Sequence, residues 1–235
     1  MLVANRSKEL VNCLFDAREY RPDGIVNGKE LWDVISHKEV HKSKPYPFIG
    51  LNHITHGMRL GELVTVTAGS GIGKSLFCRE IAHHLLGLGE TVGYIALEES
   101  VRRTALGILG IHMNKPLHLD DDMLDEKELK PAFDKTVGNG KFYTYDHFGS
   151  MESDNLLSKI RYLIKGFDCK WIFLDHLSIV VSGIQGDDER RLIDNTMTKL
   201  RSLVAEPGCG MVLVSHLKRV DTGPEEGGRI SQHPL

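Results

Sequence analysis

Residues 68–75 read AGSGIGKS, and this stretch decides the fold expected for the chain. It follows the apolar run of residues 63–66 and precedes a helical pattern that starts near Leu76. A strand, a glycine-rich loop, a Lys-Ser pair and a helix form the phosphate-binding P-loop layout. Glycines let backbone N–H groups turn around a phosphate chain, and the helix directs its positive end at the same phosphates. The stretch therefore predicts a nucleoside triphosphate site.

Lys74 and Ser75 carry the expected chemistry of this loop. Lys74 is expected to reach the terminal phosphates, and the Ser75 hydroxyl to ligand Mg²⁺. The first position is Ala68 where the pattern has glycine, and a small residue fits there because that position only starts the turn. The alternative is a glycine-rich turn that binds nothing, which Gly-Lys-Ser between a strand and a helix disfavours. The predicted nucleotide-binding residues are Gly69, Ser70, Gly71, Ile72, Gly73, Lys74 and Ser75.

The bulk properties of the chain set its class. It has 235 residues, enough for one sizeable α/β domain with a full core. Its 29 basic and 32 acidic side chains give a net charge of −3, which neither indicates nor excludes a nucleic-acid partner. The four cysteines are not in CxxC spacing, which excludes a zinc ribbon and a redox pair. No apolar run has transmembrane length and the N-terminus lacks a signal-peptide core, so we expect a cytoplasmic protein without membrane contact.

Four regions follow one another along the chain. Residues 1–24 contain a short amphipathic helix, expected over residues 5–18, that needs a partner surface to be stable. An irregular linker is expected over 25–60, the nucleotide-binding core over 61–220, and an open loop over 221–235. Because the chain ends after a loop, without a closing strand or helix, we expect it to be truncated at its C-terminus.

Strand-like and helical segments alternate through the core. This order predicts an α/β fold with a mainly parallel central sheet flanked by helices, joined by right-handed crossovers. The strands are expected near 62–67, 91–97, 141–145, 170–175 and 211–216, and the helices near 74–87, 100–112, 125–137, 152–166 and 188–205.

Carboxylates end two of the expected strands. Asp175 closes the apolar run 171–174, and at the carboxyl edge of a parallel sheet it can hold the Mg²⁺ water shell opposite the P-loop. The alternative for Asp175 is a residue that caps the next turn. Glu98 and Glu99 end the second strand, and one glutamate there can orient and deprotonate the attacking water.

Only one of these two glutamates is expected to face the nucleotide, because successive side chains of an extended segment point to opposite faces. We interpret Glu99 as a solvated surface charge. The next residue, Ser100, is expected to cap the N-terminus of the following helix.

Polar and basic residues end the last expected strand. His216 is predicted to sense the γ-phosphate, the alternative being a simple polar cap. Lys218 and Arg219 follow it, where they could grip a phosphodiester backbone, although a charged loop is usually only solvated.

The quoted segments together resemble a known family. The runs 174–182, 188–190 and 193–200 strongly resemble the helicase half of the T-seven-type phage primase–helicases, with mitochondrial Twinkle and the bacterial replicative DnaB helicases as more distant relatives. The segments 68–75, 97–100 and 215–218 fit the same pattern in the same order. The resemblance covers about residues 5–230.

The resemblance implies a RecA-like fold and a ring of about six subunits that moves along single-stranded DNA in the 5′ to 3′ direction, with nucleotide between neighbouring subunits. By position it makes Glu98 the catalytic base, Asp175 the Mg²⁺-coordinating acid, His216 the phosphate sensor and Lys218 the start of a DNA-binding loop. It implies that the helix at 5–18 docks on the adjacent subunit. It also implies Mg²⁺ as cofactor, ATP or dTTP as substrate, and replication partners such as polymerase and primase.

The sequence departs from the family's pattern in two respects, and two alternative functions share its phosphate-site residues or its nucleotide binding. The primase half of the family has no counterpart here, and the family's arginine finger and base-stacking residues are expected downstream of Leu235. A recombinase or loader of the RecA family would share every phosphate-site residue but form an open filament. A nucleotide-binding assembly module would self-associate without DNA-stimulated turnover.

Overall fold

The computed structural model describes residues 27–29, 31–36, 43–119, 125–146, 153–177, 187–205 and 208–216. The chain divides into two compact units, Met1–His41 and Lys42–Leu235. In the first unit, helix α2 (Leu31–Ser36) exposes its apolar side chains Leu31, Trp32 and Ile35. The predicted helix at 5–18 and the loop at 221–235 lie outside the described residues.

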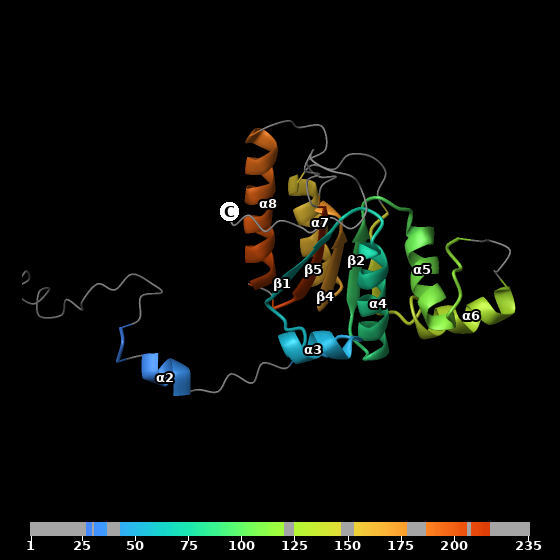
Figure 1. The fold of residues 1–235 in the computed structure, drawn as a ribbon, viewed down its shortest axis with the longest axis horizontal. Helices are drawn as coiled ribbons and strands as arrows, with labels where there is room; N and C mark the ends of the chain where they lie inside the picture. The colour runs from blue at the N-terminus through green and yellow to red at the C-terminus, as the bar shows by residue number, and fades with distance from the viewer. Residues whose placement is uncertain are drawn as a thin grey trace, which may run out of the picture. The chain divides into compact units, whose positions relative to one another are not determined.

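The second unit is built on a five-stranded parallel sheet (Figure 1). Its strands are β1 (Leu63–Ala68), β2 (Val92–Ala96), β3 (Phe142–Thr144), β4 (Trp171–Asp175) and β5 (Gly210–His216). The spatial order β1-β5-β4-β2-β3 differs from the chain order, so helical crossovers join the strands. The prediction of an α/β fold with a parallel sheet is confirmed.

Helices cover both faces of this sheet. They are α3 (Ile49–Thr55), α4 (Lys74–Gly87), α5 (Val101–Met113), α6 (Glu126–Lys135), α7 (Ser153–Gly166) and α8 (Asp187–Ala205). One core cluster joins α4 and α5 to the sheet, and a second joins α7 and α8 to its other face. The five helices expected between the strands, α4 to α8, are therefore present in the expected order.

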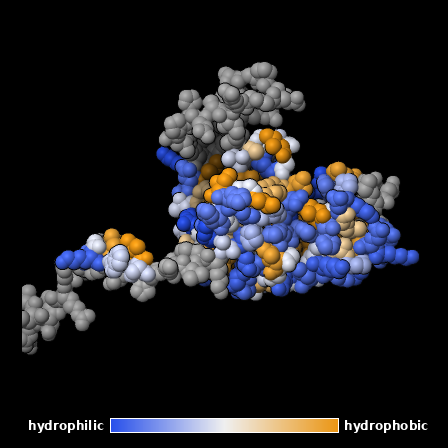
Figure 2. All heavy atoms as spheres, turned by 60° about the horizontal axis from the view of Figure 1, so that its bottom comes forward, coloured by the Kyte–Doolittle hydropathy of each residue, from blue (hydrophilic) through white to orange (hydrophobic). Residues whose placement is uncertain are grey.

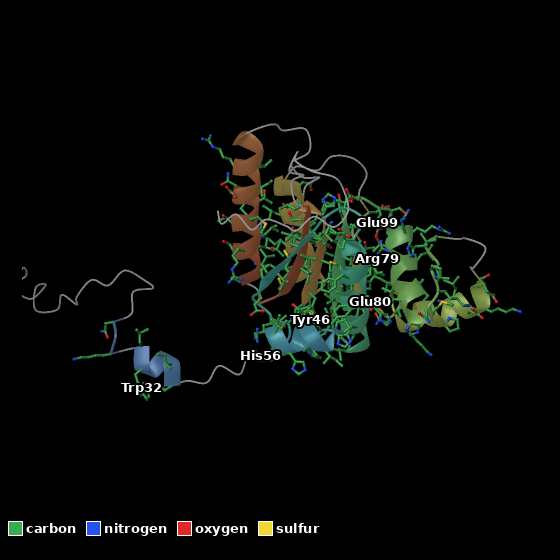
Figure 3. The ribbon with its side chains drawn as sticks, in the orientation of Figure 1. Trp32, Tyr46, His56, Arg79, Glu80 and Glu99 are labelled. Atoms are coloured by element: carbon green, nitrogen blue, oxygen red, sulfur yellow. The ribbon has the colours of Figure 1, made fainter. Side chains whose placement is uncertain are left out.

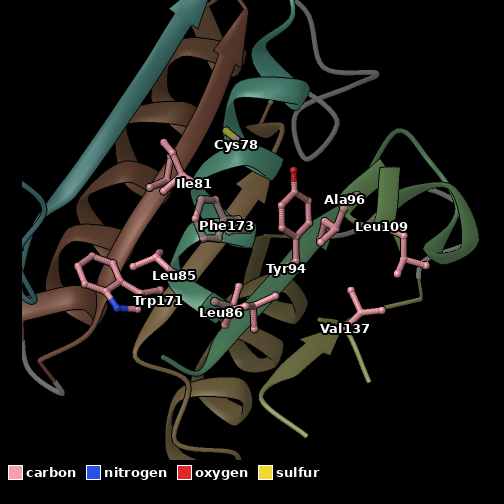
Figure 4. Packing of buried hydrophobic residues seen from close by; sticks show 14 of the residues in the cluster. Cys78, Ile81, Leu85, Leu86, Tyr94, Ala96, Leu109, Val137, Trp171 and Phe173 are labelled. Carbon is pink, nitrogen blue, oxygen red and sulfur yellow. The ribbon is translucent and has the colours of Figure 1, made fainter. Parts of the chain in front are cut away.

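Strand β4 shows how the sheet fills both clusters. All five of its residues are buried, and they alternate between the two faces. Trp171 and Phe173 pack toward α4, where Phe173 stacks on Tyr94 with ring centroids 5.5 Å apart (Figure 4). Ile172 and Leu174 pack toward α7 and α8. Burial on both faces explains the continuous apolar run in the sequence.

The segment from residue 43 to residue 58, assigned to a linker from its prolines, is anchored to the core. Lys44 and Met58 exchange two backbone hydrogen bonds of 2.8 and 2.7 Å, and Met58 is buried. The side chain of Asn52 accepts from the Tyr46 N–H and donates to the Tyr46 carbonyl, so it closes the loop ahead of α3. Lys44 Nζ also lies 2.5 Å from Glu90 Oε1. Long-range partners therefore order a stretch whose local composition indicated a loop.

The described surface is mixed in polarity. The face in Figure 2 is mainly hydrophilic, with small separate apolar patches. Within the described ranges, none of the helices combines the length and the apolar character needed to cross a bilayer.

Candidate nucleotide-binding and hydrolysis site

Strand register brings the predicted site residues to one edge of the sheet. Ala68, the last residue of β1, lies beside His216 of β5, and Ala96, the last residue of β2, lies beside Asp175 of β4. The carboxyl ends of parallel strands lie at the same edge of the sheet, and open α/β sheets bind ligands at this edge. The P-loop, the segment after β2 and Asp175 therefore share one face of the molecule.

The P-loop takes the backbone shape that its glycines allow. Gly71 and Gly73 have φ of 76° and 95°, a region that residues with a Cβ rarely adopt. Gly73 is the N-cap of α4, and the helix starts at Lys74. The first N–H groups of a helix have no intrahelical acceptor and carry partial positive charge. The loop therefore presents donors suited to a phosphate chain.

Lys74 is buried inside this loop, although it carries a charge. Its Nζ donates to the Ala68 carbonyl at 2.9 Å and to the Gly69 carbonyl at 2.6 Å. Residue 68 thus contributes its backbone oxygen, which explains why alanine can stand where the pattern has glycine. A buried ammonium at the mouth of a donor-lined loop is the arrangement that binds an anion.

Asp175 and Ser75 form the oxygen-rich part of the site. Asp175 is 6% exposed, and the Ser75 hydroxyl donates a hydrogen bond to its carboxylate. Burial raises the pKa of Asp175 and Glu99 adds to the rise, whereas the Ser75 hydrogen bond, His176 and Arg79 lower it. A buried carboxylate beside a hydroxyl is a donor set that suits a hard divalent cation such as Mg²⁺. These two residues fit the expected ion.

A cavity of about 420 Å³ adjoins these residues. Its lining side chains come from helix α4, the segment after β2, helix α5 and the end of β4: Ser75, Glu98, Glu99, Ser100, Arg103 and Asp175. Ser100 caps α5, and its Oγ accepts from the Arg103 N–H at 3.3 Å, as predicted. In the described part of the chain, this cavity included, no group of three or more His, Cys, Asp or Glu side chains could hold a metal ion.

Glu98 and Glu99 both line the cavity, and the prediction that only one of them faces the nucleotide stays a prediction. Strand β2 ends at Ala96, and the following residues form bends, to which the alternation of an extended strand does not apply. The Glu98 side chain is 57% exposed and contacts His176 Nε2.

Glu99 is not a solvated surface charge, so that interpretation is wrong. Its side chain is only 14% exposed and pairs with Arg79 of α4 (Figure 3). Thr104 Oγ1 donates to its second carboxylate oxygen at 2.7 Å. Arg79 lies on α4, a little more than one helical turn after Lys74. It is 20 positions away from Glu99 in the sequence, and no local pattern indicated that the two side chains pair.

His176 is a site residue that sequence reasoning did not assign. It directly follows Asp175, is 4% exposed and contacts the Glu98 carboxylate. The sequence did contain one signal for a role of His176 in the site, namely its position directly after Asp175. His216 ends β5 beside the P-loop strand, and its role as phosphate sensor stays a prediction. Lys218 and Arg219 lie outside the described residues.

Comparisons with known proteins agree with this architecture. The family of the DnaB-like helicase C terminal domain matches residues 45–226. The chain is 35% identical over 242 residues to the DNA helicase/primase of Enterobacteria phage T3, covering 97% of this chain and 42% of that protein. The chain therefore spans less than half the length of this curated relative.

Two solved structures show the same fold at low sequence identity. A DnaB-like replicative helicase, solved with its interactions with primase, superposes with a TM-score of 0.65 at 18% identity over 91% of this chain and 53% of that one. A KaiC-like protein from the archaeon Pyrococcus horikoshii superposes with a TM-score of 0.55 at 19% identity over 75% of this chain and 73% of that one. With its P-loop, parallel sheet and family match, the chain belongs to the DnaB-like helicase C-terminal domain family and has its RecA-like fold.

Proposed function

We propose that this chain is the motor domain of a replicative DNA helicase, which hydrolyses a nucleoside triphosphate to move along single-stranded DNA and unwind duplex. One observation carries the proposal. The P-loop cation Lys74, the oxygen pair Ser75 and Asp175, and the partly exposed carboxylate Glu98 meet at one edge of the sheet. Family membership and the phage helicase/primase relative support the choice of a helicase among P-loop enzymes.

The binding step follows from the loop. The P-loop N–H groups and the Lys74 ammonium would hold the β- and γ-phosphates, for which Lys74 would leave its two carbonyl partners. Ser75 and Asp175 would hold Mg²⁺. When bound, Mg²⁺ would neutralise part of the phosphate charge.

The chemical step would belong to Glu98. Its carboxylate is exposed to the cavity and is expected to accept a proton from a water aligned with the γ-phosphate. His176 would orient this carboxylate through their contact. Lys74 would stabilise the charge that develops on the transferred phosphate.

The coupling to DNA rests on residues after β5. His216 would sense the γ-phosphate and transmit its presence to Lys218 and Arg219, which would hold the DNA backbone. We propose assembly into a hexameric ring, with the segment at 5–18 docked on the neighbouring subunit. ATP and dTTP are both proposed substrates, and primase and polymerase are proposed partners.

The test is nucleotide hydrolysis by the full chain, with and without single-stranded DNA, on ATP and dTTP side by side. We expect hydrolysis that DNA stimulates, in a closed ring visible by electron microscopy. Stimulated hydrolysis in open filaments would indicate a recombinase or loader instead. Nucleotide binding and self-association without stimulation would contradict the motor and favour an assembly module.

A further inference from the structure

Arg79 places a charged side chain inside the molecule, between α4 and α5. Its side chain is 6% exposed, and its guanidinium packs against the backbone of Gly107 on α5. A Cβ added at Gly107 would lie 2.7 Å from Arg79 Nη1 and 2.8 Å from its Cδ. Burying a charge is costly unless it is paired, so the guanidinium needs a partner within this space.

That partner is Glu99, which is held from two helices at once. Arg79 Nη2 of α4 donates to Glu99 Oε2, and Thr104 Oγ1 of α5 donates to Glu99 Oε1 at 2.7 Å. Arg103 Nε is a third neighbour of this carboxylate, 3.7 Å from Glu99 Oε2. Both carboxylate oxygens are therefore engaged, and the backbone at residue 99 is tied to α4 and α5.

A second anchor lies two residues earlier. The Leu97 N–H donates to the carbonyl of Asp175 at 2.6 Å, which ties residue 97 to the end of β4. Glu98 stands between the two anchors, and its side chain lines the cavity beside Ser75 and Asp175. Its backbone cannot shift unless one anchor gives way.

We propose that Arg79 is a positioning residue for NTP hydrolysis, which acts through Glu99 to place the Glu98 carboxylate at the nucleotide. This inference rests on the proposed function, because it assigns Glu98 to the attacking water. The arrangement also ties Glu98 to the helix that begins with Lys74, so the phosphate-binding lysine and the proposed base share one rigid support. A merely structural ion pair would affect folding but not the placement of Glu98.

The test compares Arg79→Met with the wild-type full chain. Methionine keeps an unbranched apolar stem and removes the charge. We expect the amides of Leu97, Arg103 and Thr104 to exchange hydrogen for deuterium at least about 10-fold faster. We expect kcat to fall by about 10- to 100-fold, the loss typical of a displaced catalytic group. The nucleotide Kd should change by less than about threefold, because Lys74 and Ser75 remain in place.

Three further variants sharpen the comparison. Arg59→Met is the matched control, because Arg59 forms an ion pair with Glu62 (3.1 Å between Nη1 and Oε1) and does not line the cavity. This variant should leave hydrogen exchange at residues 97–104 unchanged. Arg79→Lys should restore part of kcat, because it keeps a cation near Glu99. Should Arg79→Met fail to fold, Gly107→Ala displaces the same guanidinium and should raise exchange in the same direction.

A double variant separates this inference from the proposed function. Arg79→Met added to Glu98→Gln should cause no further loss of kcat, because both changes would disable one group. A full additional loss, or unchanged exchange at residues 97–104 in Arg79→Met, would overturn the positioning role. An active Glu98→Gln, or a chain without turnover, would instead count against the proposed function, and the exchange measurement would still decide the role of Arg79.

Discussion

Lys74 holds its charge inside the P-loop on two backbone carbonyls, so its removal deletes the cation aimed at the phosphates. We predict that Lys74→Ala weakens nucleotide binding by at least about 30-fold, because truncating a buried charged partner typically costs about 2–5 kcal/mol. Titration of a fluorescent nucleotide measures the change. Lys130→Ala is the control, since Lys130 is an exposed lysine that pairs with Asp134 within α6. Tight binding by Lys74→Ala would refute the phosphate assignment.

Glu98 and Glu99 are adjacent in sequence but differ in environment, since one is exposed to the cavity and the other is held by Arg79. We predict that Glu98→Gln retains nucleotide binding and loses about 10²- to 10⁴-fold in turnover, the usual contribution of a general base. Single-turnover hydrolysis at saturating nucleotide measures it.

Glu99→Gln provides the comparison. It keeps the shape of the side chain but removes the charge that pairs with Arg79, so it should lower the unfolding free energy by about 1–3 kcal/mol, as expected for a weakened charged hydrogen bond. Its turnover should exceed that of Glu98→Gln. The reverse order of activities would show that the roles of the two glutamates are exchanged.

At the scale of elements, a histidine pair joins α4 and α5, the two helices that also hold Glu99. His83 Nε2 lies 3.2 Å from His112 Nδ1. Burial lowers the pKa of His83 below its usual 6.5, and the neighbouring His112 and His84 lower it further. A lowered pKa in the folded state means that the unfolded chain binds the proton first as the pH falls.

We therefore predict that the contribution of neutral His83 to the free energy of unfolding is fully present above pH 6.5. This contribution is lost as the pH falls through the lowered pKa of His83. Urea unfolding at a series of pH values measures this, and His83→Gln should flatten that part of the profile. The exposed His53→Gln is the control and should leave the profile unchanged. A profile that His83→Gln does not alter would contradict the assignment of this pH dependence to α4 and α5.

At the scale of the whole molecule, apolar side chains beside the nucleotide site face solvent. Ile72 of the P-loop is 72% exposed and Leu76 of α4 is 48% exposed. In a ring with nucleotide between subunits, a neighbour would cover them and gain about 25 cal/mol for each Å² of apolar surface removed from water. The proposed assembly thus offers a reason for apolar residues at these positions.

We predict that Leu76→Ser weakens ring formation by about 3- to 10-fold in subunit concentration, because Leu76 is already half-buried and covering the rest contributes about half of the 1.5–3 kcal/mol of a full burial. Analytical ultracentrifugation with Mg²⁺ and a non-hydrolysable nucleotide measures assembly. Leu88→Ser is the matched control, because Leu88 is 43% exposed at the other end of α4. Equal assembly by both variants would mean that the interface lies elsewhere.

Much of this architecture is readable from the amino-acid sequence alone. The P-loop, the Ser100 cap and the five alternating strands and helices depend on patterns within a few neighbouring residues, because backbone geometry and burial periodicity act locally. The place of Asp175 at the ligand edge follows in the same way, since a buried parallel strand ends there. These features were predicted and are present.

Three features were decided only by the tertiary structure. They are the buried environment of Glu99, the contact of His176 with Glu98, and the anchoring of the segment from residue 43 to residue 58 on the core. Each depends on partners that are distant in sequence: Glu99 on Arg79, and Lys44 on Met58 and Glu90. His176 is next to Asp175 in the chain, but its contact with Glu98 arises only because β2 and β4 are neighbours in the sheet. Local propensity carries no information about such contacts, since packing of whole elements brings the side chains together and sets which charges are buried.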